Sequence, residues 1–408
     1  MTRKLYNENA YIKEFSAQIK DLIKRPEGNA IVLDETYFYP EGGGQPCDFG
    51  RIEQLGITNV IIEDEVIFHL TNGATDHLHV DQIVDCGIDF DRRFAFMQQH
   101  TGQHILSACA EKLFDANTVG FHIGDDYVTI DLDKKLPDDA IVAMEELANS
   151  IVFSNIPVVA HYPTPDELAK MPLRKQPKVT ENIRVIEVQD FDFSPCGGTH
   201  TKTTAEIGLI KIKRSDSYKA GIRLEFVCGL FALENYKKRN DTVNALMRLF
   251  SVQDSEILNF CQQLLENQKA ERMAISELKE QLYALQVSQL LSNYEDELEQ
   301  DIKVISLIET QMSMVDLRLK TSLLCEHENI IVIAAANEND KTHFVLSKSK
   351  NLPIEFDMGS LFKMHMAPQG IKGGGNAFVA QGGINSIIDI ESTIAPVEFA
   401  LQSILEND

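Results

Sequence analysis

The chain has 408 residues, more than one ordinary hydrophobic core accommodates, so we expect two or three domains. Hydrophobic residues make up 44% and charged residues 25%, as in typical globular proteins, and no apolar run approaches the length needed to span a bilayer. The formal net charge of −24 argues against indiscriminate nucleic-acid binding, because an acidic chain repels phosphate at long range.

The N-terminal residues and the cysteines indicate the cellular compartment in which the protein works. Residues 1–20 are polar and charged and lack the apolar stretch of a secretory signal. The seven cysteines include no Cys-x-x-Cys pair and are odd in number, which fits a reducing compartment better than a disulfide framework. We therefore expect a cytoplasmic protein without a membrane partner, in which only Cys196 has neighbours that suggest a role beyond packing.

Residues 1–90 are predicted to form a small β-barrel. Short β-branched or apolar runs at 30–33, 59–62 and 66–70 are separated by turn residues. Between the first two runs, the segment from Thr36 to Gln45 contains the consecutive glycines Gly42, Gly43 and Gly44, which suit neither a helix nor a strand interior. This loop is either a wide turn of the barrel or a segment whose backbone approaches a ligand.

Residues 91–235 are predicted to mix helices and strands. Residues 93–114 have the periodicity of a helix in which Ile105, Cys109 and Leu113 share an apolar stripe. A second helix is expected to begin with Asp138 as its cap. Strands are expected at 127–132, 156–160, 183–188, 207–212 and 222–228. The alternation predicts an α+β layer with one face of its sheet covered.

Residues 236–300 are predicted to form a helical arm. Glycine and proline are absent from 230–301, and Ile275, Leu278, Leu282 and Leu285 follow the three-four spacing of a helical seam. Polar residues interrupt this seam, so we expect a helical hairpin or a short coiled coil.

Residues 301–408 are predicted to form a compact α/β domain. Strands are expected at 304–308, 330–336 and 343–347, and helices at 315–325 and 397–405. Between the last strand and the last helix, residues 370–383 are dense in glycine, which implies a close backbone approach to a ligand or to a neighbouring element.

Two pairs of metal-ligand residues stand out in the sequence. His100 and His104 are four residues apart on the predicted helix, so both imidazoles project from one face. Cys196 and His200 flank a glycine-rich loop about ninety residues later. Zinc prefers imidazole and thiolate in tetrahedral geometry, so the two pairs together predict a zinc site. It is either a closed structural site or a site with three firm ligands and a looser fourth, for which His200 is the candidate.

The spacing excludes the His-Glu-x-x-His arrangement of zinc proteases, because no glutamate lies between the two histidines. The intervening Thr101, Gly102 and Gln103 include no good general base at neutral pH. Chemistry at the site would depend on the metal, on polar positioning and on a hydroxyl of the substrate.

Basic residues cluster locally in spite of the acidic composition. One cluster holds Arg174, Lys175 and Lys178, and a second holds Lys211, Lys213, Arg214 and Lys219. Each is either a nucleic-acid contact or an ordinary solvated face.

The order of the motifs resembles a known family. The segment from Thr36 to Gln45, the pair His100/His104 and the pair Cys196/His200 occur in the order found in the editing domain of alanyl-tRNA synthetase and, still more closely, in the free-standing alanyl-tRNA editing proteins called AlaX. The last segment resembles the C-terminal, DHH-associated domain of alanyl-tRNA synthetase. With the helical arm, the resemblance covers nearly the whole chain and indicates the long form of AlaX.

The resemblance implies zinc-dependent hydrolysis of tRNA(Ala) wrongly charged with serine or, as a second candidate, glycine. It implies His100, His104, Cys196 and His200 as zinc ligands. Thr36 lies where the family places a hydroxyl that recognises the serine side chain. The expected catalytic set is Thr36, Gln45 and Gln103, and the expected pocket glycines are Gly42, Gly43 and Gly44. A site that hydrogen-bonds the serine hydroxyl would spare correctly charged tRNA.

The resemblance also bears on the partner. No segment resembles an aminoacylation domain, so the protein is expected to edit in trans. Asn376 stands where DHH phosphoesterases commonly carry histidine, which disfavours phosphoesterase chemistry in the last domain. That domain is expected to bind tRNA or to form a homodimer. The expected tRNA contacts are Lys211, Lys213, Arg214, Lys372, Gly373, Gly374 and Gly375, with Lys348 and Lys363 as further cations.

Two other functions are compatible with the same residues. One is editing of the threonyl-tRNA synthetase type, which shares both ligand pairs. The other is a non-catalytic tRNA-binding protein with a closed structural zinc site.

Overall fold

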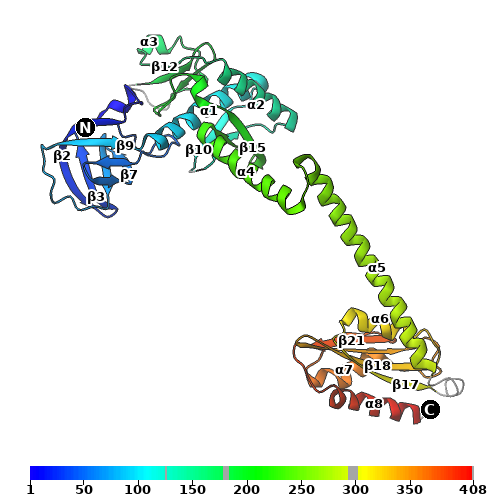
Figure 1. Cartoon of the computed structure of the whole chain (residues 1–408). Helices are drawn as coiled ribbons and strands as arrows, with labels where there is room; N and C mark the ends of the chain where they lie inside the picture. The colour runs from blue at the N-terminus through cyan, green and yellow to red at the C-terminus, as the bar shows by residue number, and fades with distance from the viewer. Residues whose placement is uncertain (125, 178–182, 293–301, 407–408) are drawn as a thin grey trace. The chain divides into compact units, whose positions relative to one another are not determined.

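The computed structural model describes residues 1–124, 126–177, 183–292 and 302–406 and divides into two compact units, 1–249 and 250–408 (Figure 1). Both units mix helices and strands, which confirms the predicted α+β class. Among the described residues, no helix is both long and apolar enough to cross a membrane. The predicted domain boundaries near residues 90, 235 and 300 stay predictions.

A seven-stranded antiparallel sheet forms the first part of unit 1. Its order is β6-β5-β9-β2-β3-β8-β7. The strands are β2 (Glu14–Arg25), β3 (Gly28–Leu33), β5 (Gly50–Ile52), β6 (Leu55–Ile57), β7 (Asn59–Glu63), β8 (Val66–Thr71) and β9 (Ile83–Ile88). Two short strands, β1 (Arg3–Lys4) and β4 (Glu35–Thr36), pair in parallel beside it. The three strand predictions in this region are confirmed, whereas closure into a barrel stays a prediction.

Sequence reading missed the longest strand of this sheet, β2. Its residues alternate as a strand should, with Ala17 and Ile19 buried, but the pairing with β3 shifts register between Ile19 and Asp21. Such a bulge moves later side chains to the other face, so Leu22 falls out of the alternation. The charged residues of the solvent face further hide the pattern.

The second part of unit 1 is built on helix α1 (Phe90–Phe114). The side chain of Asp89 caps its first turn by accepting from the backbone of Arg92, and Asp115 ends it in a left-handed conformation. Every residue from 95 to 110 is buried, so α1 is a central helix, not an amphipathic surface helix. The expected stripe was therefore too narrow, and its last member, Leu113, is exposed.

Two sheets and helix α2 lie against α1. The first sheet has the order β10-β11-β16-β15, and the second has the order β12-β13-β14. Their strands are β10 (Thr118–Ile123), β11 (Val128–Leu132), β12 (Val158–His161), β13 (Val185–Val188), β14 (Asp192–Pro195), β15 (Ile210–Tyr218) and β16 (Gly221–Cys228). The helices are α2 (Asp138–Phe153) and the short α3 (Pro165–Leu168), and α4 (Gly229–Phe250) follows β16.

Two local predictions in this part were wrong. Asp138 is the first residue of α2, and Pro137 occupies the cap position, so the carboxylate lies in the first turn and interacts with the helix dipole. Ile207 lies in a short 3-10 helix and not in the strand that begins at Ile210.

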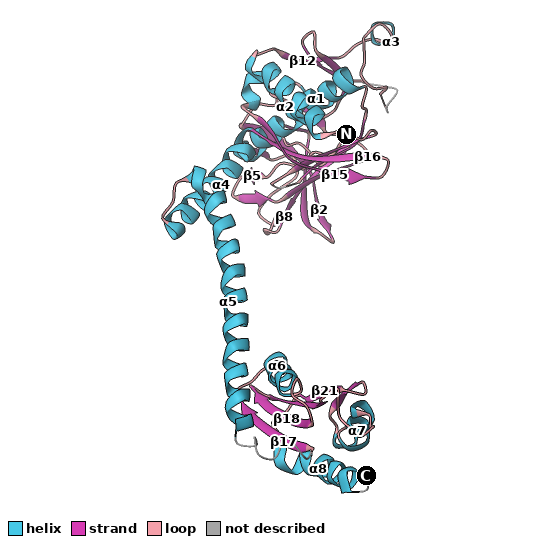
Figure 2. Ribbon diagram, turned by 90° about the vertical axis from the view of Figure 1, so that its right-hand side faces the viewer, coloured by secondary structure: helices cyan, strands magenta, loops and turns pink. Residues whose placement is uncertain are grey.

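Unit 2 is a five-stranded sheet covered on both faces (Figure 2). Its strands are β17 (Lys303–Thr310), β18 (Ile330–Glu338), β19 (Lys341–Lys348), β20 (Lys372–Gly375) and β21 (Val379–Ile384), in the order β17-β18-β19-β21-β20. Its helices are α5 (Ile257–Ser292), α6 (Met314–Leu324), α7 (Met358–His365) and α8 (Ile390–Glu406). Alternate residues of β18 pack against α7 and α8 on one face and against α5 and α6 on the other.

The glycine-dense segment at 370–383 contributes a strand pair, β20 and β21. A Cβ on Gly382 would lie 2.4 Å from the ring of Phe362 on α7, and one on Gly359 would lie 2.7 Å from the carbonyl oxygen of Gly375. Helix α7 therefore packs directly on this hairpin, which is the predicted close approach to a neighbouring element.

The predicted arm corresponds to α4 and α5, and residues 293–300 of it lie outside the described residues. The expected seam of Ile275, Leu278, Leu282 and Leu285 is exposed on α5. The buried side of α5 is instead near its end, at Tyr283, Val287 and Leu291, and the last two belong to the core shared with α6 and β18. The hairpin or coiled-coil arrangement stays a prediction.

Candidate metal centre

The four predicted ligands, from two distant segments, meet in unit 1. One potential ligand atom from each of His100, His104, Cys196 and His200 lies within 4.8 Å of the other three. The Sγ of Cys196 is 3.2 Å from Nε2 of His100, and Nε2 of His104 is 3.3 Å from Nε2 of His200. Three imidazoles and one thiolate at these separations are the donor set of a tetrahedral zinc site, so the residues fit the metal.

Helix α1 carries one ligand pair, and strand β14 leads into the loop that carries the other. His100 and His104 project from the buried centre of α1, and Cys196 follows directly after β14. The loop between Cys196 and His200 lies against the helix: a Cβ on Gly198 would be 2.2 Å from Cε1 of His100. Only glycine allows the loop to come this close, which explains why a glycine stands there.

The two helix histidines each have their other ring nitrogen engaged. Nδ1 of His100 is 2.8 Å from Oε1 of Gln45, which also accepts from the backbone N–H of Thr199. Nδ1 of His104 is 3.3 Å from Oδ2 of Asp192. An oxygen acceptor at Nδ1 favours the tautomer with its proton there, so both Nε2 lone pairs are free for a metal.

Asp192 is itself held in place. Nε of Arg174 donates to its Oδ1 at 2.7 Å, and the hydroxyl of Ser194 donates to its Oδ2 at 3.0 Å. Burial disfavours the carboxylate, but the hydrogen bond from His104 and the charge of Arg174 outweigh it and lower the pKa of Asp192 to about 2. Asp192 is therefore an anion beside the metal cluster at neutral pH.

The thiol of Cys196 is also shifted towards its charged form. Burial opposes ionisation, but the neighbouring His100 and His200 lower its pKa well below the ordinary value. A thiolate is the form that binds zinc, so the electrostatics agree with the geometry.

The glycine-rich loop forms one wall of the cluster. Gly42 and Gln45 close a tight turn by exchanging two backbone hydrogen bonds, and Gly43 and Gly44 have positive φ angles of 59° and 85°. A Cβ on Gly44 would lie 2.8 Å from the ring of Phe121, whose centroid is 5.3 Å from that of His100. The turn thus places Gln45 against His100.

A buried ion pair fastens this loop to α1. The guanidinium of Arg93 contacts both carboxylate oxygens of Asp48 and donates to the carbonyl oxygens of Ala10 and Tyr37 at 2.9 and 2.6 Å. Asp48 also accepts from the backbone of Tyr39. Because Tyr37 lies within the loop and Asp48 follows it closely, the pair fixes the loop relative to the metal helix.

Thr36 is fully buried and hydrogen-bonded. Its hydroxyl is 2.9 Å from Nε2 of His69 and accepts from the backbone of Phe38. Nδ1 of His69 is 2.9 Å from the carbonyl oxygen of Ile31, so that nitrogen carries the proton and Nε2 accepts from Thr36. One lone pair of the Thr36 hydroxyl is left to accept a further hydrogen bond.

Gln103 lies on α1 with His100 and His104, but its side chain forms its hydrogen bond within the core. Its amide donates to the hydroxyl of Ser107 at 2.7 Å. The structure thus joins Gln45 directly to a ligand histidine and gives Gln103 a partner on its own helix. Asp192, Arg174 and Thr199 were missed as supporting residues, because a lone aspartate, a basic cluster and a loop threonine carry no sequence signal for this role.

The basic candidates of unit 1 are paired with carboxylates. Lys211 bonds Glu145, Lys213 bonds Glu225, and Arg214 lies within 3.2 Å of both Glu225 and Asp216. Their tRNA contacts stay a prediction. Lys178 of the other cluster lies outside the described residues.

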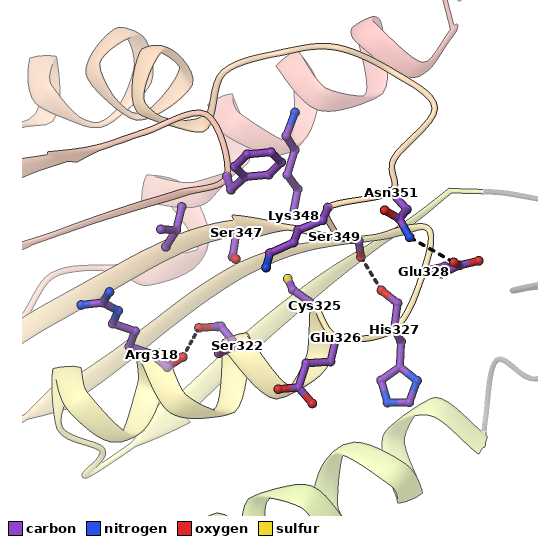
Figure 3. A pocket seen from close by; sticks show the side chains of 14 residues that line it. Arg318, Ser322, Cys325, Glu326, His327, Glu328, Ser347, Lys348, Ser349 and Asn351 are labelled. Carbon is purple, nitrogen blue, oxygen red and sulfur yellow. Dashed lines mark hydrogen bonds between the residues drawn. The ribbon is translucent and has the colours of Figure 1, made fainter.

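Unit 2 contains a cavity of about 500 Å³ at the C-terminal end of α6 (Figure 3). Its lining includes Arg318, Ser322, Cys325 and Ser347. Lys348 also borders it, but its ammonium donates to the carbonyl oxygen of Phe356 and lies 4.2 Å from the ring centroid of that residue. Lys372 is exposed at the start of the edge strand β20, where Gly373, Gly374 and Gly375 pair with β21.

Comparison with known families gives two matches. The family described as threonyl and alanyl tRNA synthetase second additional domain matches residues 183–224, which include Cys196 and His200. The family described as tRNA synthetases class II (A) matches residues 5–92, which include the glycine-rich loop. The two matches therefore include the glycine-rich loop and the second ligand pair, whereas His100 and His104 lie between them.

Individual relatives extend over nearly the whole chain. The alanyl-tRNA editing protein AlaX-L of Pyrococcus horikoshii is 30% identical over 393 residues, which are 95% of either chain. The alanine–tRNA ligase of Pyrococcus furiosus is 30% identical over 98% of this chain, and the match spans 44% of that ligase. Among solved structures, the C-Ala domain of Aquifex aeolicus alanyl-tRNA synthetase matches 26% of this chain with 22% identity and a TM-score of 0.23.

Proposed function

The chain belongs to the family of free-standing alanyl-tRNA editing proteins, and on that premise we propose that it hydrolyses serine from wrongly charged tRNA(Ala), in trans and with zinc. The observation that carries this proposal is the cluster of His100, His104, Cys196 and His200 in a chain that matches an editing protein over 95% of its length. The two family matches cover both the loop and the second ligand pair.

Zinc bound by these four residues would act as a Lewis acid towards the ester that joins the amino acid to the tRNA. The chain's own residues prepare the site. Gln45 and Asp192 orient the two helix imidazoles, and all three ligand histidines are buried. Thr101 donates to the carbonyl oxygen of Met97 and Gln103 donates to Ser107, and neither an alcohol nor an amide is a good general base at neutral pH. Proton transfer would then involve a hydroxyl of the substrate.

The selectivity for serine is assigned to Thr36. The remaining lone pair of its hydroxyl can accept a hydrogen bond from the serine side chain, and an alanine side chain offers no donor. Alanine would leave that lone pair unused, so the Thr36 hydroxyl would favour serine over alanine by about one hydrogen bond. We assign Gly42, Gly43 and Gly44 to the wall of the same pocket, because their turn places Gln45 against His100. Glycyl-tRNA(Ala) is the second candidate substrate.

The remaining parts of the chain are assigned to tRNA. We infer that the barrel and the α/β core carry the chemistry, and that the arm and the C-terminal domain bind tRNA or form a homodimer. Lys372 at the exposed edge of β20 is the candidate phosphate contact in unit 2, beside Gly373, Gly374 and Gly375. The substrate places the protein in the cytoplasm, where tRNA is charged.

A release assay tests the proposal. Radiolabelled Ser-tRNA(Ala), Gly-tRNA(Ala) and Ala-tRNA(Ala) are incubated with zinc-loaded protein, and the free amino acid is measured. We expect rapid release of serine and a rate for alanine close to that of buffer. Absence of serine release would overturn the proposal.

The same assay separates the two alternatives. Editing of the threonyl type predicts faster release from Ser-tRNA(Thr) than from Ser-tRNA(Ala). A non-catalytic tRNA-binding protein with a structural zinc predicts binding of all these tRNAs and hydrolysis of none.

A further inference from the structure

The three ligand histidines differ in what holds their second ring nitrogen. Nδ1 of His100 bonds Gln45, and Nδ1 of His104 bonds Asp192. Nδ1 of His200 is buried, yet it has no hydrogen-bond partner among the described residues of the chain. One ligand imidazole of the cluster is therefore unsupported.

Gln45 and Asp192 are themselves held by hydrogen bonds, so the helix histidines are more firmly oriented than His200. Asp192 is held by Arg174 and Ser194, and the amide of Gln45 donates to Thr199 at 2.7 Å while its oxygen accepts from the backbone of that residue. The rings of His100 and His104 thus have fixed orientations on a buried helix. The ring of His200 has no such partner among the described residues, although its loop is held by Arg184, which donates to the carbonyl oxygens of Cys196 and Gly198.

The neighbour of His200 shows the same feature. The hydroxyl oxygen of Thr201 is buried and has no partner among the residues that the structure describes, although the backbone of Thr201 bonds Thr101. Buried polar atoms without partners are rare in native proteins, and they mark strain or a group that binds a ligand. Two of them in succession lie at the end of the Cys196–His200 loop.

Outer hydrogen bonds matter for metal affinity. A partner at the second nitrogen fixes the tautomer, restricts the ring and makes the ligating nitrogen more basic, and its loss typically weakens metal binding about 10- to 100-fold. An imidazole without such a partner is a weaker and more mobile ligand than its neighbours.

We propose that His200 is the displaceable ligand of the zinc cluster, and that Nδ1 of His200 and the hydroxyl of Thr201 mark the side on which the aminoacyl ester binds. The ordering of the ligands is a property of the chain alone, whereas the identity of the substrate rests on the proposed function. His100, His104 and Cys196 are the firm ligands.

Zinc affinity of matched variants tests the ordering. His104→Ala and His200→Ala each remove one imidazole, and the affinity is measured by competition with a chromogenic chelator. We expect His104→Ala to lose at least about tenfold more zinc affinity than His200→Ala, because only the His104 variant lacks an imidazole that a hydrogen bond orients. An equal or larger loss for His200→Ala would overturn the proposal.

Folding controls are needed for the comparison of zinc affinities. Circular dichroism and thermal melting of both variants, with and without zinc, show whether a loss of affinity reflects unfolding. His200→Gln serves as a second variant if the alanine variant does not fold. If neither variant at residue 200 folds while His104→Ala does, His200 is a firm structural ligand and the proposal is wrong.

Cobalt provides an independent readout of the substrate side. The Co²⁺-loaded wild-type protein is titrated with a non-hydrolysable seryl amide of 3′-amino-3′-deoxyadenosine, and binding is followed by calorimetry. We expect the visible cobalt absorption to change as a ligand exchanges. An unchanged spectrum at saturation would contradict displacement.

The outcomes distinguish this proposal from the proposed function. If the affinity order is as expected and the wild-type protein does not release serine from Ser-tRNA(Ala), the ligand order stands and the function is wrong. If serine is released normally while both variants lose zinc equally, the function stands and the ligand order is wrong.

Discussion

At the scale of single residues, the site depends on hydrogen bonds that orient a few buried atoms. Gln45 and Asp192 determine which nitrogen each helix histidine offers to a metal. His69 accepts the proton of the Thr36 hydroxyl and so determines which way its free lone pair points. None of these three partners is a metal ligand. Substitutions one step away from the cluster are therefore informative tests.

Thr36→Val removes the hydroxyl that we assign to serine recognition. We expect the ratio of serine release to alanine release to fall at least about tenfold, because a polar pocket that loses its acceptor loses discrimination worth 1.4 kcal/mol or more. Thr36→Ser is the matched control, since it keeps the hydroxyl, and it should retain most of the ratio. An unchanged ratio in Thr36→Val would show that another group recognises the hydroxyl.

His69 predicts a pH dependence of stability. Burial lowers its pKa from 6.5 to about 4, so between these values the unfolded chain binds a proton that the folded chain does not. The free energy of unfolding should therefore be fully retained above pH 6.5 and should decrease as the pH falls towards 4, by at most about 1.4 kcal/mol per pH unit from this group. Urea unfolding at several pH values measures it.

His69→Gln is the comparison for that measurement, because glutamine does not titrate. Its unfolding free energy should be lower at pH 7 and should fall less steeply between pH 6.5 and 4 than that of the wild type. Equal slopes for the two proteins would mean that His69 is already charged in the folded state.

At the scale of elements, the loop from Cys196 to His200 must lie directly on α1. Gly198→Ala would place a methyl group 2.2 Å from Cε1 and 2.4 Å from Nδ1 of His100, so either the ring or the loop must move. We expect zinc affinity to fall at least about tenfold, which metal analysis and chelator competition would detect.

Gly197→Ala is a closely matched control, because a Cβ at Gly197 would have no atom within 4 Å. Zinc binding by this variant should resemble that of the wild type. Equal behaviour of the two alanine variants would show that the loop does not press on His100.

The elements also show how much the sequence can predict. Helix α1 and its ligand pair were predictable because two residues four positions apart on a helix project from the same face. Strand β2 was not, since its bulge breaks the alternation. Asp192 was not predictable either: its role depends on a contact with His104 across 88 residues, and no local pattern encodes such a contact.

At the scale of the whole molecule, the chain consists of two units with separate hydrophobic cores. The cores around α1 and the seven-stranded sheet belong to residues 1–249, and those around the five-stranded sheet belong to residues 250–408. Every residue of the metal cluster lies in the first unit. The chemistry and the second unit should therefore be separable.

A fragment of residues 1–249 tests this separation. It should fold, bind zinc and hydrolyse Ser-tRNA(Ala) with a kcat near that of the full chain, but with a higher KM because the assigned tRNA contacts of unit 2 are missing. Steady-state kinetics of both proteins at one salt concentration provide the measurement. An unchanged KM would remove unit 2 from tRNA binding.

The acidic charge of the molecule is the reason why we expect a higher KM for the fragment. The net charge is −24, and the basic candidates Lys211, Lys213 and Arg214 are already paired with carboxylates. Long-range attraction to tRNA is therefore weak, and affinity has to come from specific local contacts.

We propose that this chain removes serine from tRNA(Ala) by means of a zinc ion held by His100, His104, Cys196 and His200. The most direct test measures serine release from Ser-tRNA(Ala) by protein stripped with a chelator and then reloaded with increasing zinc. We expect release to fall to the buffer rate in the stripped protein and to return in proportion to bound zinc, up to about one equivalent, with Cys196→Ala failing to recover. Stripped protein that releases serine as fast as the loaded protein would contradict the claim.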